Sequence, residues 1–137
     1  MFTRGPRRIP ADQIDLLIIG KGYAMAKLTD ANLQVWKPVR PELTEKVTGK
    51  LQLDGPTKMV LTRVEPGGMF RPHRDKYRHL FHVLCGQGLF GVDDAVYRLS
   101  AGMSLQIEAG ELHGYENCGT EELLLISLNL HQSDNMS

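Results

Sequence analysis

The chain has 137 residues, about one domain's length, with 42% hydrophobic and 23% charged residues, values typical of globular proteins. Its sixteen basic and sixteen acidic residues cancel and form no basic stripe, which argues against nucleic-acid binding. The longest early apolar run, residues 16–19, is far shorter than a membrane span of about 20 residues. We therefore expect one domain over residues 1–137, with neither nucleic acid nor a membrane as partner.

The N-terminal part of the chain carries weak structural signals. Residues 1–12, in which three arginines lie among glycine and proline, predict a short arm. Residues 14–19 and 24–28 fit either strands or a short helix. Residues 39–53, interrupted by a proline and a glycine, predict loop and edge strand. The core is therefore expected further along the chain.

Beyond residue 50 helical periodicity is hard to find, and short β-rich runs alternate with turn signals. Residues 65–68 (EPGG) predict a sharp stop after the first run, and residues 93–94 (DD) predict a two-residue hairpin turn. This pattern is typical of a sandwich or barrel, so we expect an all-β fold with its core barrel in residues 57–130. The predicted strands are residues 57–64, 79–85, 89–92, 95–99, 103–107 and 122–130.

Cys85 and Cys118 are the only cysteines of the chain. Nothing else in the sequence indicates secretion, so two free, buried thiols are expected rather than a disulfide. The expected location is the reducing cytoplasm.

The segment from His73 to His79 (HRDKYRH) concentrates groups that bind metals. In an extended strand, alternation places His73, Asp75, Tyr77 and His79 on one face and three cationic side chains on the other. Imidazole and carboxylate together suit divalent iron, manganese, nickel, zinc or copper. A solvated polar edge strand explains this segment equally well when it is taken alone.

The spacing around this segment resembles that of the cupin superfamily. The first cupin motif runs Gly, five residues, His-x-His, three residues, Glu, six residues, Gly. The second runs Gly, five residues, Pro-x-Gly, two residues, His, three residues, Asn. At the same spacings, with residues 87–101 between the motifs, this chain has Gly67, His73, Asp75, His79 and Gly86, then Gly102, Glu108, Gly110, His113 and Asn117. The resemblance implies a single-domain cupin double-stranded β-helix, which is a jelly-roll barrel.

Three positions depart from the cupin pattern: Asp75 replaces its second histidine, His79 its glutamate and Glu108 its proline. Three imidazoles and one carboxylate remain. The resemblance therefore implies one divalent metal ion (Fe, Mn, Ni, Zn or Cu) held by His73, Asp75, His79 and His113. Aspartate is shorter than histidine, which leaves open a three-histidine site in which Asp75 only orients a ligand. Glu108 is expected at the surface.

The remaining candidates are tyrosines and histidines outside this set. Tyr77 and Tyr115 share strand parity with the ligands, so they either line a pocket or simply fill the barrel. His82 falls on the opposite parity and is expected to pack or to face a dimer partner. His131, near the C-terminal end, is expected to be exposed. No catalytic residue is assigned beyond the candidate pocket tyrosines.

Three functions fit these residues. The resemblance implies a metal-dependent dioxygenase, lyase or isomerase acting on a small organic molecule inside the barrel. A small-molecule binding or sensing module stays open, as does a metal-free sugar isomerase-like protein in which the histidines act as acid and base. The 2-oxoglutarate oxygenases are disfavoured, because no Lys or Arg follows Arg98 to anchor their co-substrate. The resemblance to short cupins also implies a homodimer, to which residues 16–19 contribute.

Overall fold

The computed structural model describes residues 26–131 of the chain. Contacts divide the chain into a unit of residues 1–30 and a unit of residues 31–137, and each is taken by itself. Of the first unit only residues 26–30 are described, and they form neither helix nor strand. The predicted arm (residues 1–12) and the apolar segment 14–19 lie outside the described residues. A single domain over residues 1–137 therefore stays a prediction.

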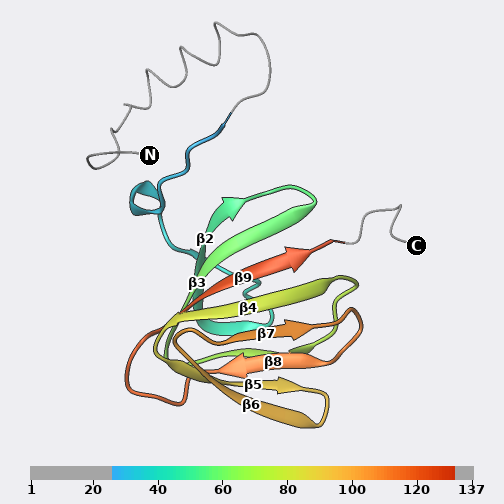
Figure 1. Cartoon of the computed structure of the whole chain (residues 1–137). Helices are drawn as coiled ribbons and strands as arrows, with labels where there is room; N and C mark the ends of the chain where they lie inside the picture. The colour runs from blue at the N-terminus through green and yellow to red at the C-terminus, as the bar shows by residue number, and fades with distance from the viewer. Residues whose placement is uncertain (1–25, 132–137) are drawn as a thin grey trace, which may run out of the picture. The chain divides into compact units, whose positions relative to one another are not determined.

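The second unit is all-β in its described residues. The strands pair antiparallel in the order β6-β5-β8-β3-β9-β4-β7, with β2 also on β3 and β1 on β2 (Figure 1). They form a nearly closed antiparallel barrel, which confirms the predicted jelly-roll fold. The elements are η1 (Ala31–Leu33), β1 (Lys37–Pro38), β2 (Thr44–Leu53), β3 (Thr57–His73), β4 (Arg78–Cys85), β5 (Gln87–Val92), β6 (Ala95–Ser100), β7 (Ser104–Ile107), β8 (His113–Glu116) and β9 (Leu123–Leu130).

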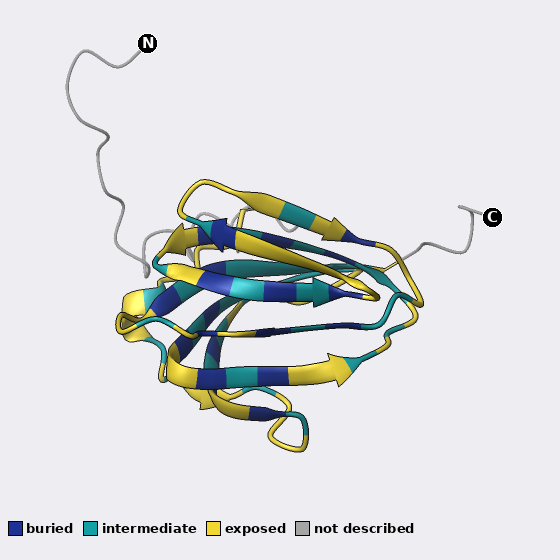
Figure 2. Cartoon of the chain, turned by 90° about the horizontal axis from the view of Figure 1, so that it is seen from below, coloured by how far each residue is buried: buried dark blue, intermediate teal, exposed yellow. Residues whose placement is uncertain are grey.

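Burial alternates along the strands, as a barrel with one inward face requires (Figure 2). In β4 the side chains of Phe81 and Val83 are buried while their neighbours are more exposed. Each large apolar side chain buried in this way stabilises the fold by about 1.5–3 kcal/mol. The core consists of Val47, Val64, Phe70, Phe81, Val83, Phe90, Val92, Leu99, Ile107, Tyr115, Leu123 and Leu125.

The strands predicted after residue 79 are confirmed to within a few residues at their ends. The hairpin turn at Asp93 and Asp94 is confirmed as well, since Val92 pairs with Ala95 across it. Asp93 has a φ of 50°, a left-handed conformation that aspartate tolerates better than most residues. The segment expected as loop and edge strand, residues 39–53, holds a loop and then the long strand β2, which pairs with β3 on one side and only with the two-residue β1 on the other.

Strand β3 contradicts the stop predicted at residues 65–68, because it continues to His73. The register between β2 and β3 shifts at this point, so residues 65–68 bulge out of the ladder. Before the bulge β3 pairs with β9, and beyond it with β8. Proline and glycine therefore bend the strand around a corner of the barrel, where the missing N–H of Pro66 costs no ladder hydrogen bond.

The buried side chain of Asn117 holds this corner together. Its Nδ2 donates to the carbonyl of Val64 at 3.0 Å and to that of Glu121 at 2.8 Å. Its Oδ1 accepts from the backbone N–H of Gly119 at 3.0 Å. Because β8 ends directly before Asn117, the same contacts set how β8 lies against the end of β3. This register puts His73 directly opposite His113.

Both cysteines are free, as predicted, but exposed rather than buried. Asn117 turns into the core, and Cys118 follows it in the chain, facing solvent. Among residues 26–131, no helix has the length and apolar character needed to cross a bilayer. The cytoplasmic location stays a prediction.

We expect Gly86→Ala to destabilise the fold more than Gly102→Ala. Both glycines have positive φ, 77° and 92°, so both variants incur backbone strain of about 1–3 kcal/mol. A Cβ at Gly86 also collides with the backbone of Glu122 and Leu123, whereas a Cβ at Gly102 meets nothing within 4 Å. Overpacking adds roughly 1–3 kcal/mol. Equal shifts of the two variants in urea unfolding curves would contradict this packing argument.

Candidate metal centre

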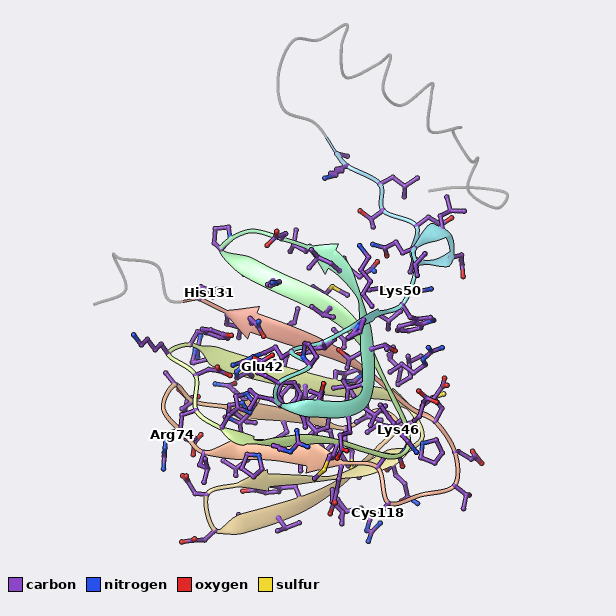
Figure 3. The ribbon with its side chains drawn as sticks, turned by 180° about the vertical axis from the view of Figure 1, so that it is seen from behind. Glu42, Lys46, Lys50, Arg74, Cys118 and His131 are labelled. Carbon is purple, nitrogen blue, oxygen red and sulfur yellow. The ribbon has the colours of Figure 1, made fainter. Side chains whose placement is uncertain are left out.

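The segment from His73 to His79 is not one extended strand, so the alternation argument for it is wrong. His73 is the last residue of β3, residues 74–77 form a loop, and β4 begins at Arg78. The loop is tied to the turn that precedes His113: the backbone N–H of Gly110 donates to the Asp75 carbonyl at 2.9 Å. The Arg74 side chain donates to the Gly110 carbonyl at 2.7 Å. In Figure 3, Arg74 and His131 lie at one end of the barrel and Cys118 lies toward the other.

The predicted ligands nevertheless converge at this end. Asp75 Oδ2 lies 3.0 Å from His73 Nε2, 2.8 Å from His79 Nε2 and 3.5 Å from His113 Nε2. The ligand atoms of His73, Asp75 and His113 all lie within 4.8 Å of one another. His79 is outside this mutually close triad but in direct contact with Asp75. All four side chains are about nine-tenths buried or more.

Each imidazole has an oxygen acceptor behind it. His73 Nδ1 lies 2.9 Å from the carbonyl oxygen of Arg71, and His113 Nδ1 lies 2.9 Å from that of Glu111. His79 Nδ1 lies 3.0 Å from Asn129 Oδ1. Because carbonyl and amide oxygens only accept, these contacts favour a proton on Nδ1 of each ring, the tautomer in which Nε2 can bind a metal ion. The contact of His79 Nε2 with Asp75 Oδ2 is a hydrogen bond only while Nε2 also carries a proton, which a bound ion would displace.

The burial and the charges of these four side chains favour a bound cation. His113 Nε2 is buried and has no hydrogen-bond partner in the described structure. Burial lowers the pKa of His79 and of His113, so both rings lose their proton more readily. Burial alone would raise the pKa of Asp75, but the His79 hydrogen bond, the charge at His73 and the Arg40 guanidinium outweigh it and lower the pKa. Three imidazole nitrogens and one carboxylate oxygen gathered in a largely buried site form a donor set that fits a divalent ion.

Arg40 supplies the outer contact of Asp75. Its guanidinium lies 3.1 Å from Asp75 Oδ1, which leaves Oδ2 for the histidines, and 3.5 Å from Glu42. Arg40 lies in the turn between β1 and β2 and has a φ of 40°. The sequence contains no signal for this contact, because 35 residues separate the two side chains.

The site opens into a cavity of about 160 Å³ inside the barrel. Its wall is formed by inward-facing residues of β3, β9 and β4 that lie in register across the sheet. The polarity of these rows falls with distance from the candidate site. Two rows line the cavity in full: Lys58, Asn129 and His79, then Val60, Ser127 and Phe81. In the next row, Thr62, Leu125 and Val83, only Thr62 lines it.

The two candidate tyrosines both line this cavity. Tyr115 packs edge-on against Phe70 and Phe81 in the core, and burial raises the pKa of its phenol. Tyr77 is half-buried and packs against the rings of His79 and His131, at 5.0 and 4.3 Å between centroids. The Tyr115 side chain thus mainly fills the barrel, while Tyr77 lies beside the candidate ligand His79.

The other predictions at this end of the barrel agree with the structure. His82 contacts Ser104 at 2.6 Å, away from the cluster, and His131 and Glu108 are exposed. Lys58 and Asn129, which sequence analysis missed, do carry a signal: both lie on the inward parity of predicted strands.

The comparisons with known proteins agree with this architecture. A structure of the polyketide cyclase RemF from Streptomyces resistomycificus matches with a TM-score of 0.70 and 20% identity, over 77% of this chain and 79% of that one. A predicted oxalate decarboxylase from Thermotoga maritima matches with a TM-score of 0.71 and 16% identity, over 77% and 100%. KdgF from Halomonas sp. matches with a TM-score of 0.69 and 19% identity, over 81% and 100%.

These identities establish the fold alone. No curated protein matches the chain. The family model described as Cupin domain matches residues 60–129, which span the corner of β3, the four candidate ligands and most of β9. On this match and the barrel topology, the chain belongs to the cupin superfamily.

Proposed function

We propose that the protein binds one divalent metal ion through His73, Asp75, His79 and His113 and acts on a small organic molecule in the barrel. The observation that carries this proposal is the arrangement of three inward-facing Nε2 atoms around Asp75 Oδ2, at 2.8 to 3.5 Å. Iron, manganese, nickel, zinc and copper all suit such a mixed imidazole and carboxylate set. A bound ion would act as a Lewis acid toward an oxygen atom of the substrate.

The protein's own residues support a metalloenzyme of the dioxygenase, lyase or isomerase type. Phe81 and Val60 offer apolar contacts to a small molecule below the site, while Asn129 and Ser127 offer polar contacts beside it. A polyketide cyclase and a predicted oxalate decarboxylase share this fold, so the same barrel accommodates enzymes of small molecules. A non-catalytic binding or sensing role uses the same cavity.

A metal-free role has one observation in its favour. Asp75 and His79 form a direct hydrogen-bonded pair at 2.8 Å, an arrangement that also suits proton transfer to and from a bound sugar. In this alternative the histidines act as acid and base. Metal content separates it from the metal-dependent proposal.

We expect about one divalent ion per chain in the purified protein, because the described ligands form a single cluster. His73→Ala and His113→Ala should each abolish metal binding, since each removes a ligand from a different strand. His82→Ala is the matched control, because His82 contacts Ser104 outside the cluster. Elemental analysis and calorimetric titration check this. No metal after purification, and none taken up from iron, manganese, nickel or zinc solutions, would favour the metal-free role.

Asp75→Ala tests whether the carboxylate binds the ion directly. We expect it to lower metal affinity as severely as His79→Ala, because both variants lose a bond to the ion. If Asp75 only orients a histidine, its removal should weaken affinity by about ten- to a hundredfold while His79→Ala costs far more. Titrations of both variants with the same metal distinguish the two arrangements.

We further propose a homodimer. Four apolar side chains, Leu33, Val35, Leu51 and Leu53, are 83%, 74%, 40% and 51% exposed. They belong to neighbouring segments, because the Gln34 side chain donates to the Leu51 carbonyl at 2.7 Å. Light scattering should give twice the chain mass, and Leu51→Glu with Leu53→Glu should shift it toward the monomer. A monomeric wild-type protein at every concentration would rule the dimer out and leave the metal proposal intact.

A further inference from the structure

Lys58 occupies an unusual place for a lysine, on the inward face of a barrel strand. Strand alternation puts it on the same side of β3 as Val60, Thr62 and Val64, and it lines the cavity beside the metal centre. In register it faces Asn129 on β9, and Asn129 faces His79 on β4. Lys58, Asn129 and His79 thus form one continuous row across three strands.

The charge of Lys58 has no counter-charge in the part of the chain that the structure describes. No hydrogen bond or ion pair links the side chain of Lys58 to any residue of the range 26–131. Asp75 is the one acidic side chain among the described residues that line the cavity, and Arg40 and the histidines already engage it. Lys58 as a residue is half-buried. Lysines are rarely turned inward without a partner, because an ammonium loses hydration when it is buried.

We infer that the cavity binds a small carboxylate and that Lys58 selects its negative charge; this inference rests on the metal-binding function proposed above. With a divalent ion in place, the ion, Arg40 and Lys58 together outweigh the single carboxylate of Asp75. The cavity is therefore net positive and attracts anions. An ammonium with three donors is a strong partner for a carboxylate oxygen.

The row geometry sets the length of the ligand. Neighbouring strands lie about 4.8 Å apart, so the backbones of Lys58 and His79 lie roughly 10 Å apart across β9. A molecule with one oxygen group at the metal centre extends over Asn129 toward Lys58, whose side chain shortens the gap. The cavity volume of about 160 Å³ is well below the roughly 300 Å³ at which pockets for drug-sized ligands begin. Short hydroxy-, keto- and dicarboxylic acids match both limits.

The second row of the cavity wall limits which other molecules can bind. Val60 and Phe81 flank Ser127 below the ligand, so one hydroxyl lies between two apolar side chains. A short carbon chain packs against the apolar pair, while its charged end stays at the level of Lys58. A strongly polar molecule without a negative charge satisfies neither Lys58 nor the apolar pair, and its binding should be weaker.

The test compares a small dicarboxylate with its uncharged analogue on metal-loaded protein. Malonate and malonamide are titrated by calorimetry against wild type, Lys58→Met and Lys58→Arg, with Lys37→Met as the matched control. Lys37 lies in β1, is exposed and does not line the cavity. The metal content of each sample is measured before and after titration, because malonate itself chelates metals.

We expect wild type to bind malonate at least about tenfold more tightly than malonamide. Lys58→Met should weaken malonate binding by about ten- to a hundredfold, the usual range for one charge-assisted contact, and leave malonamide unchanged. Lys58→Arg and Lys37→Met should keep the preference, and all variants should keep their metal. Full metal content with equal malonate affinity in wild type and Lys58→Met, or with no malonate binding at all, would overturn the inference alone. Absence of metal from wild type would overturn the proposed function instead.

Discussion

Three imidazoles and one carboxylate lie close together and largely buried at one end of the barrel. Each of these side chains needs partners for its charge and its hydrogen-bonding atoms, and these partners determine the geometry of the site. The carbonyls of Arg71 and Glu111 and the amide of Asn129 fix the outer nitrogens of the rings. Arg40 fixes the outer oxygen of Asp75. What remains on the inner side is three Nε2 atoms gathered around Asp75 Oδ2 at 2.8 to 3.5 Å. A divalent metal bound among them would replace the protons there without changing the hydrogen bonds outside.

The fold brings these groups together through the corner in β3. That strand lies in both halves of the barrel, pairing first with β9 and then with β8. The bulge between the two pairings is held by Asn117, which follows β8 directly. His73 and His113 are therefore positioned by one local structure, although 40 residues of sequence separate them. His79 lies on β4. Because β4 pairs with β9, and β9 with β3, His79 lies at the same end of the barrel as His73.

Most of the strands and the four candidate ligands were predictable from the sequence, but only from local signals such as turn residues and motif spacing. Strands β4, β5, β6, β7 and β9 have turn signals at their ends, and motif spacing identified the four candidate ligands. The course of β3 was not predictable from its residues, because Pro66 and Gly67 have the same local signature in a bulge as in a turn. Arg40 is brought to Asp75 by long-range packing, for which a single sequence holds no signal. The inward position of Lys58 could have been predicted from the alternation of side chains along its strand.

The loop position of Asp75 brings its short side chain up to the histidines, although the family pattern has the longer histidine at this position. On a regular strand, an aspartate two residues after His73 would hold its carboxylate farther back than an imidazole reaches. In the loop of residues 74–77, freed from ladder pairing and tied to Gly110, the backbone brings the carboxylate within 2.8 Å of His79 Nε2. Compared with the family pattern, the carboxylate of the site thus lies in the loop and not on β4, and Arg40 contacts it there. The β4 position holds His79, whose row ends at Lys58, so the exchange of the two residues places a proposed metal ligand and the proposed anion contact in one row.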